Sequence, residues 1–215
     1  MEEPKRIPSS KKLIDRIGNP LEWSTVHKCL LIICFWVLLA PFTTLLFHHY
    51  ISHPEKVLFF DPVFMKKLLP LGWGLTVAWS ILLVVGLQLR NRRPENRTFA
   101  YVTVFLWWSQ EAISAVCAGP LTTPAAMVLL GQGFVAFLLF RIPVVLVGLG
   151  FALLLVVGSI FASHYGLLPY APLMAAPLYD NGRIANLWAL LLGPAYLIIY
   201  LGFLSLSVYI ITRWR

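Results

Sequence analysis

Charged side chains are scarce in this chain, where Asp, Glu, Lys and Arg together make up 12% of the 215 residues. A soluble domain of this size carries roughly 25% charged residues, about twice as many. Hydrophobic residues instead account for 59% of the sequence, and the mean hydropathy is +0.79. This composition argues against an ordinary soluble globular domain and indicates a membrane protein.

Acidic residues are especially few, with nine Asp and Glu against 17 Lys and Arg, which gives a net charge of +8. A basic balance can indicate nucleic-acid binding, but here the basic residues do not form a patch interleaved with aromatics. They lie in short clusters between apolar runs, as the positive-inside rule describes for membrane proteins. We therefore expect the lipid bilayer, and no nucleic acid, as the partner of this charge.

Motifs for covalent or catalytic chemistry are also missing. The three cysteines, Cys29, Cys34 and Cys117, all lie within apolar runs without a Cys-x-x-Cys pair, which favours small buried residues over a disulfide framework. There is no nucleophile elbow, no His-Glu-x-x-His, no phosphate-binding glycine loop and no paired acidic motif for magnesium. These residues therefore give no indication of an enzyme active site of their own.

What the chain does contain is a series of long apolar runs. A helix needs about 20 apolar residues to cross the hydrocarbon core of a bilayer. Six runs meet or approach this length: Cys29 to Phe47, Leu68 to Leu89, Phe99 to Ala118, Ala125 to Phe140, from after Pro143 to Ala162, and Ala185 to Ile211. Proline disfavours helix at the residue before it, so we expect a tight turn at Arg141-Ile142-Pro143. The sequence thus predicts an all-α bundle of six transmembrane helices.

The positions of the basic residues predict how this bundle is oriented. Thirteen of the 17 Lys and Arg fall on the side shared by both ends of the chain, and the other four are Lys56, Lys66, Lys67 and Arg183. Because basic residues accumulate on the cytoplasmic side, we expect both termini in the cytoplasm and the bundle in a bacterial inner membrane. Residues 1–28 then form a basic cytoplasmic lead-in, 29–211 the membrane domain and 212–215 a cytoplasmic end. The two longer outer segments, 48–67 and 163–183, are rich in aromatics and prolines, and we expect them to pack rather than extend into solvent.

Histidines gather near the outer ends of the first and fifth runs, at His48, His49, His53 and His164. Imidazoles that converge with carboxylates, here Asp61 and Asp180, can bind a transition metal, and two on facing helices can bind a haem. His48 and His49 point about 100° apart on a helix, so only His49 and His53 can share a face. The alternative is that the histidines are tolerated at the interface and do not meet.

Glu111 is the one carboxylate deep inside a predicted span. An ionisable group at that depth is costly and suggests either a hydrogen-bonding node between helices or a ligand contact. Gln110 and Gln132 are near enough in depth to assist it. Gly193-Pro194 predicts a kink in the last run, and Tyr196 and Tyr200 follow on one face, where they can line a cavity. The candidate ligand-binding residues are therefore Glu111, Gln110, Gln132, Tyr196 and Tyr200.

The last apolar run passes directly into Thr212-Arg213-Trp214-Arg215, as if its helix continued into a cytoplasmic domain. Together with the basic lead-in, the short loops and Ile17-Gly18-Asn19-Pro20 before the first run, this architecture resembles the N-terminal membrane input domains of bacterial signalling enzymes. The relevant families are class III adenylyl cyclases, diguanylate cyclases with GGDEF output and six-span sensor histidine kinases. The resemblance implies a homodimer whose sixth helix passes a packing change to a cytoplasmic output domain. It carries over no functional residue.

On these grounds we expect a membrane sensor or anchor domain that binds a small ligand or cofactor and serves as the regulatory membrane part of a larger enzyme such as a nucleotide cyclase. One alternative is a small transporter component, which would predict inverted repeats and several polar groups at the midplane. A second alternative is a membrane-embedded haem or quinone redox protein, for which histidines at matched depth on facing helices would be needed.

Overall fold

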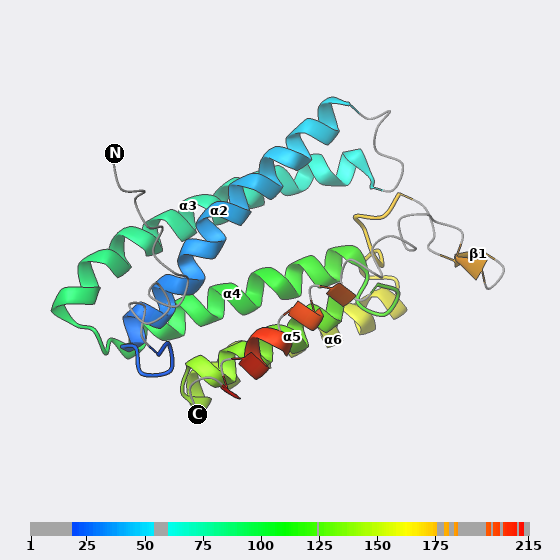
Figure 1. The fold of residues 1–215 in the computed structure, drawn as a ribbon. Coiled ribbons are helices and arrows are strands. Elements are labelled where there is room, and N and C mark those ends of the chain that lie inside the picture. The colour runs from blue at the N-terminus through cyan, green and yellow to red at the C-terminus, as the bar shows by residue number, and fades with distance from the viewer. Residues whose placement is uncertain are drawn as a thin grey trace, which may run out of the picture.

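The computed structural model describes residues 19–53, 60–123, 125–175, 179–180, 183–184, 197–198, 200–202, 204–209 and 211–212. Its main elements are the helices α2 (Thr25–Ser52), α3 (Pro62–Arg92), α4 (Arg97–Ala118), α5 (Ala125–Leu139) and α6 (Ile142–His164). Two antiparallel two-residue strands, β1 (Tyr179–Asp180) and β2 (Arg183–Ile184), follow α6. The described fold is therefore helical almost throughout, as the sequence predicted (Figure 1).

The turn between α5 and α6 confirms the break expected at Arg141-Ile142-Pro143. Helix α5 ends at Leu139 and α6 begins at Ile142, with Arg141 as its N-cap residue and Pro143 in its first turn. Proline suits this position because its fixed φ matches the helix and its missing N–H would have no partner there. Two residues between the helices thus suffice to reverse the chain.

Helices α2 and α3 extend beyond their apolar runs. Helix α2 continues to Ser52 and α3 begins at Pro62, so much of the segment 48–67, expected as an outer loop, is helical. The start of α3 has a local cause: the Asp61 carboxylate accepts hydrogen bonds from the N–H groups of Val63 (2.8 Å) and Phe64 (3.2 Å). An N-cap aspartate followed by proline is a strong helix-start signal.

Helix α4 is the central element of the bundle. Helix α2 packs mainly against α3, and α6 packs mainly against α4, while α4 also contacts α2 and α5. Figure 1 shows the α2–α3 hairpin on one side of α4, with α5 and α6 on the other. Eleven residues of α4 are buried, more than in any other described helix. A polar group on α4 therefore lies where both halves of the bundle meet.

Three of the described helices, α2, α3 and α6, are long and apolar enough to cross a membrane. Their 28, 31 and 23 residues correspond to about 42, 46 and 35 Å, against a hydrocarbon core of about 30 Å. Helix α4 is long enough at 22 residues, but the polar residues Ser109, Gln110 and Glu111 interrupt it. Helix α5, at 15 residues, reaches only about 22 Å. The structure thus supports a membrane-associated protein with three candidate spans.

The loops at one end of the bundle pack against each other instead of extending into solvent. The Asp61 N–H donates to the Leu173 carbonyl (2.9 Å), and the Leu173 N–H donates to the Cys117 carbonyl (3.0 Å). Phe60 and Met174 form an isolated β-bridge beside them. We call this end, formed by residues 60–65, 117–123 and 170–174, the loop end.

Tyr170 closes the loop end over the C-terminus of α4. Its hydroxyl oxygen accepts hydrogen bonds from the N–H groups of Leu121 (2.8 Å) and Thr122 (3.0 Å). The chain leaves α4 through Gly119 at φ 94°, where a Cβ atom would lie 2.7 Å from Thr122 Oγ1. Glycine is required at this position both for the backbone conformation and for the close approach.

We expect Gly148→Ala to destabilise the bundle relative to Gly150→Ala on the same helix. A Cβ atom on Gly148 would overlap Trp108 Cδ1 and lie 2.9 Å from Trp108 Cγ, whereas one on Gly150 meets nothing within 4 Å. Both changes bring the same gain in helix propensity, so the difference isolates the overlap, which costs about 1–3 kcal/mol. Chemical unfolding of the purified variants in detergent measures it. Equal unfolding free energies would contradict the close α4–α6 contact.

Candidate functional site

The centre of the bundle contains a buried hydrogen bond between α3 and α4. The Trp79 indole N–H donates to the Gln110 side-chain oxygen at 2.7 Å, and the two side chains are 0% and 8% exposed. On its other side, Trp79 stacks on Trp36 of α2, with ring centroids 6.0 Å apart and planes 14° from parallel. Three helices are thereby connected at one level.

This bond explains how Gln110 is tolerated in an apolar core. An amide or an indole N–H without a partner in such surroundings costs several kcal/mol, roughly 2–7 by transfer measurements. Each of the two side chains removes that cost for the other. The sequence pointed to Gln110 as a helper of Glu111, but its side-chain oxygen is bonded to Trp79 instead. Glu111 follows on the same helix and is half-buried.

Gln132 of α5 is in the opposite situation. Its side chain is 1% exposed, and neither the amide nitrogen nor the amide oxygen has a hydrogen-bonding partner among the described residues. Helix α5, which carries this amide, packs against α4 and α6 on the side of α4 away from the α2–α3 hairpin (Figure 1). Inside the bundle, the amide donor and the amide acceptor of Gln132 are therefore both without a described hydrogen-bonding partner.

Trp108 of α4 lies at the junction of α4, α5 and α6. Its fully buried ring fills the space beside Gly148 of α6, and its Cη2 atom lies 3.5 Å from where a Cβ atom of Gly133 would be. Gly133 is the residue next to Gln132. The Trp108 indole nitrogen also has no partner among the described residues. We call Gln110, Glu111, Trp108 and Gln132 the polar belt.

The structure gives little information on the two tyrosines that were predicted to line a cavity. Tyr196 lies outside the described residues. Tyr200 is helical and half-buried. The described contacts do not connect Tyr200 to the polar belt, so its role stays a prediction.

Among the described residues, no group of three or more His, Cys, Asp or Glu is placed to hold a metal ion. His49 and His53 do come together, with ring centroids 4.6 Å apart. The His53 Nδ1 atom lies 3.1 Å from the His49 carbonyl oxygen, which engages one of its ring nitrogens. His48 and His164 are exposed, and the His164 ring lies against Tyr165. A transition metal or haem at these residues stays a prediction from sequence.

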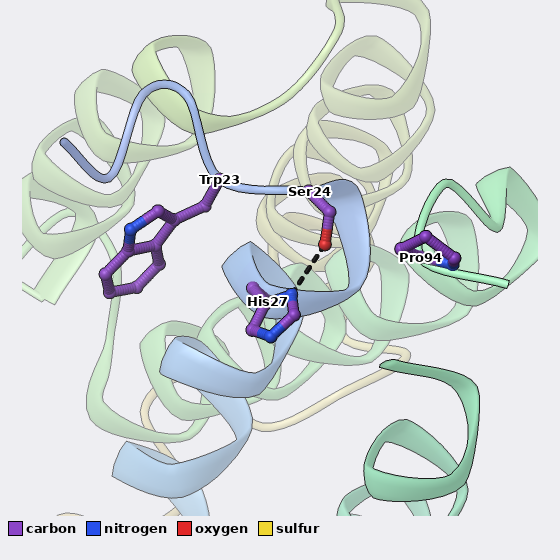
Figure 2. A pocket seen from close by; sticks show the side chains of 4 residues that line it. All are labelled: Trp23, Ser24, His27 and Pro94. Carbon is purple, nitrogen blue, oxygen red and sulfur yellow. Dashed lines mark hydrogen bonds between the residues drawn. The ribbon is translucent and has the colours of Figure 1, made fainter. Parts of the chain in front are cut away.

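A cavity that the sequence did not indicate lies at the opposite end of α2 from the histidines. Trp23, Ser24, His27 and Pro94 line it, and its volume is about 480 Å³ (Figure 2). The signal in the sequence was weak, because a Trp-Ser-x-x-His segment before an apolar run is equally typical of an ordinary membrane-interface anchor. Only the return of the chain through Pro94 creates the second wall.

Comparisons with protein-family models, with curated proteins and with solved structures found no match to this chain.

We expect Trp79→Phe and Gln110→Leu to be coupled in stability. Each single change leaves a buried partner without its hydrogen bond, at a cost of about 1–3 kcal/mol, whereas the double change removes both polar groups. The double variant should therefore lose less than the sum of the singles, with a coupling free energy of about 1 kcal/mol. Unfolding of all four proteins in one detergent measures it. Strictly additive losses would show that the bond contributes no stability.

Proposed function

We propose that this chain is a multi-pass membrane domain that senses a small molecule at the polar belt and anchors a cytoplasmic output domain. The observation that carries the proposal is the Gln132 side chain, which is 1% exposed with both amide atoms unpartnered among the described residues. A purely structural glutamine at this depth would be expected to have a partner, as Gln110 has in Trp79.

The ligand class follows from the groups that line the junction. The Gln132 amide offers one acceptor and two donor hydrogens, and the Trp108 indole offers a further donor. Around them the packing is apolar, with Gly133 and Gly148 against the Trp108 ring. A small, mostly apolar molecule with a carbonyl or hydroxyl group satisfies these requirements. Glu111, on the neighbouring helix, is the further polar group for selecting it, whereas the Gln110 oxygen is bonded to Trp79.

The membrane arrangement that we propose has six spans with both termini in the cytoplasm. Besides α2, α3 and α6, the proposed spans are α4, α5 and the last apolar run, residues 185–211. Helix α5 is short, but it packs against α4 and α6, which reduces its exposure to lipid. The described basic residues support the orientation. They lie at the start of α2, around the α3–α4 turn and in the α5–α6 turn: Lys28, Arg90, Arg92, Arg93, Arg97 and Arg141. We place this end in the cytoplasm of a bacterial cell.

Signalling in this proposal is a shift between two packings of the bundle. A ligand changes the equilibrium only by its differential affinity for the two states. A ligand that forms hydrogen bonds with the Gln132 amide favours the packing in which this amide lies at the junction of α4, α5 and α6. The last helix then transmits the change to an output domain of the cyclase or kinase type, in a homodimer, as the resemblance to membrane input domains implies.

Alkaline phosphatase fusions test the orientation. The enzyme is active only outside the cytoplasm, so a fusion after His53 should be active and one after Glu95 inactive. The reason is that Arg90, Arg92, Arg93 and Arg97 retain the α3–α4 turn on the cytoplasmic side. A green fluorescent protein fused at the same two positions is the reciprocal control, because it fluoresces only in the cytoplasm. The reverse pattern would overturn the proposed orientation.

We expect Gln132→Leu to lose a co-purifying small molecule while the protein becomes no less stable. Leucine removes an amide without a protein partner, so the unfolding free energy should stay equal or rise by about 1–3 kcal/mol. Native mass spectrometry and analysis of organic extracts from protein in lipid nanodiscs measure retention. Leu130→Ala, which changes a 62% exposed residue of the same helix, should retain the molecule.

Two outcomes would contradict this assignment. If Gln132→Leu is strongly destabilised and its extract is unchanged, the amide has a structural partner and is not a ligand contact. If Glu111→Gln retains the molecule as well as the unaltered protein does, Glu111 does not belong to the site.

A further inference from the structure

The cavity beside the start of α2 is lined by polar side chains that have no role in the proposed sensing function. Trp23 and Ser24 come from the segment before α2, His27 comes from the first turn of α2, and Pro94 comes from the turn between α3 and α4 (Figure 2). It therefore lies where one candidate span begins and another ends. If those helices cross a bilayer, this is the level of the lipid headgroups.

The two walls of the cavity are connected by hydrogen bonds. The Val26 N–H donates to the Pro94 carbonyl at 2.9 Å, and the Thr25 hydroxyl donates to the Glu95 carboxylate. On the other side, the Lys28 ammonium donates to the Leu21 carbonyl at 2.7 Å, which holds the lead-in segment against the helix. The cavity is thus part of the folded structure rather than a gap between independent loops.

Ser24 and His27 leave a donor free for an anion. Their side chains are hydrogen-bonded at 2.6 Å between Ser24 Oγ and His27 Nδ1, so Ser24 does not cap the helix. When the hydroxyl donates to Nδ1, the neutral ring carries its proton on Nε2, and the imidazolium carries a proton there as well. His27 is exposed, so in these two forms its Nε2–H is available to an acceptor from solvent. In the other neutral tautomer the Nδ1–H donates to Ser24 and Nε2 carries no proton, so binding of an anion selects the two forms with the Nε2–H.

The charges around the cavity favour an anion. The first turn of α2 contains no acidic residue of its own, but the Glu95 carboxylate accepts hydrogen bonds from the Thr25 N–H (3.4 Å) and hydroxyl and lies at the positive end of the helix dipole. The charge that attracts an anion must therefore come from the basic residues of the α3–α4 turn. Arg93 flanks Pro94 directly, and Arg92 and Arg97 lie within three residues of it. Two carboxylates lie nearby, Glu95 bonded by the Thr25 hydroxyl and Glu22 bonded by the Asn19 amide. Both donors are neutral, so both carboxylates keep their charge, and the three arginines outnumber them.

We propose that this cavity binds the phosphate group of an anionic phospholipid. The His27 Nε2–H donates to a phosphate oxygen, the adjacent arginines supply the positive charge, and the Trp23 indole lies at the headgroup level, where tryptophan is enriched. The site goes beyond the proposed sensing function and does not involve Gln132. It fixes the cytoplasmic ends of α2 and α3 to one lipid leaflet.

The experiment uses the full chain in nanodiscs that contain phosphatidylglycerol and phosphatidylcholine. Native mass spectrometry counts the lipids retained after the disc is removed, and a titration of phosphatidylglycerol into detergent-solubilised protein gives the affinity. We expect preferential retention of phosphatidylglycerol and about a tenfold weaker affinity in His27→Leu, the loss typical of one charge-assisted hydrogen bond. Arg93→Ala should weaken binding similarly. Lys67→Ala, which removes an equal charge at the opposite end of α3, should bind like the unaltered protein.

Three results would overturn the proposal. Unchanged affinity in His27→Leu would show that the cavity is not the site. An equal loss in Lys67→Ala would show that general surface charge retains the lipid. Displacement of the lipid by millimolar inorganic phosphate would assign the cavity to a soluble phosphate compound. Because Gln132→Leu should leave lipid retention unchanged, a failure here is distinguishable from a failure of the proposed sensing function.

Discussion

The hydrogen bond from the Trp79 indole to the Gln110 amide is the contact on which the arrangement of the bundle depends. It joins α3 to α4, and the stack of Trp36 on Trp79 adds α2 to the same level. An apolar bundle in lipid has little hydrophobic preference between one helix rotation and another, because lipid tails are as apolar as the core. A buried polar pair supplies that preference, since any rotation that separates the two groups leaves both unsatisfied.

The other half of the bundle is specified by shape instead. Trp108 fits against α6 only because Gly148 has no side chain, and Gly133 allows α5 to approach the same ring. Close packing of this kind is the usual source of helix association in membranes. The unpaired Gln132 amide is an exception within this half, and its cost to the fold is the physical reason to look for a ligand there. Functional sites are where such local conflicts are expected.

The two ends of the bundle differ in how they are closed and in their charge. At the loop end, backbone hydrogen bonds between residues 60–61, 117 and 173 close the structure, and Tyr170 covers the C-terminus of α4. At the other end, positive charge accumulates, and the start of α2 is hydrogen-bonded to the α3–α4 turn beside an open cavity lined by Trp23, Ser24, His27 and Pro94. One end is closed by its own chain, whereas the other presents donors and charge to whatever lies beside it. This asymmetry is the common basis for the proposed orientation and the proposed lipid site.

The sequence by itself determined that the composition is that of a membrane protein, and it determined most helix positions. Long apolar runs predicted the helices, Pro143 predicted the break before α6, and α4 and α5 begin and end within two residues of the expected bounds. The length of an apolar run is a local property, so it is visible without any knowledge of contacts. Only the tertiary structure decided which polar residues are paired: Gln110 with Trp79, 31 positions away, and Gln132 with no described partner. It also decided that Pro94 forms the cavity wall beside Ser24 and His27. Such pairings depend on helix rotation and on chain return, which are set by packing between distant segments and leave no pattern in the sequence.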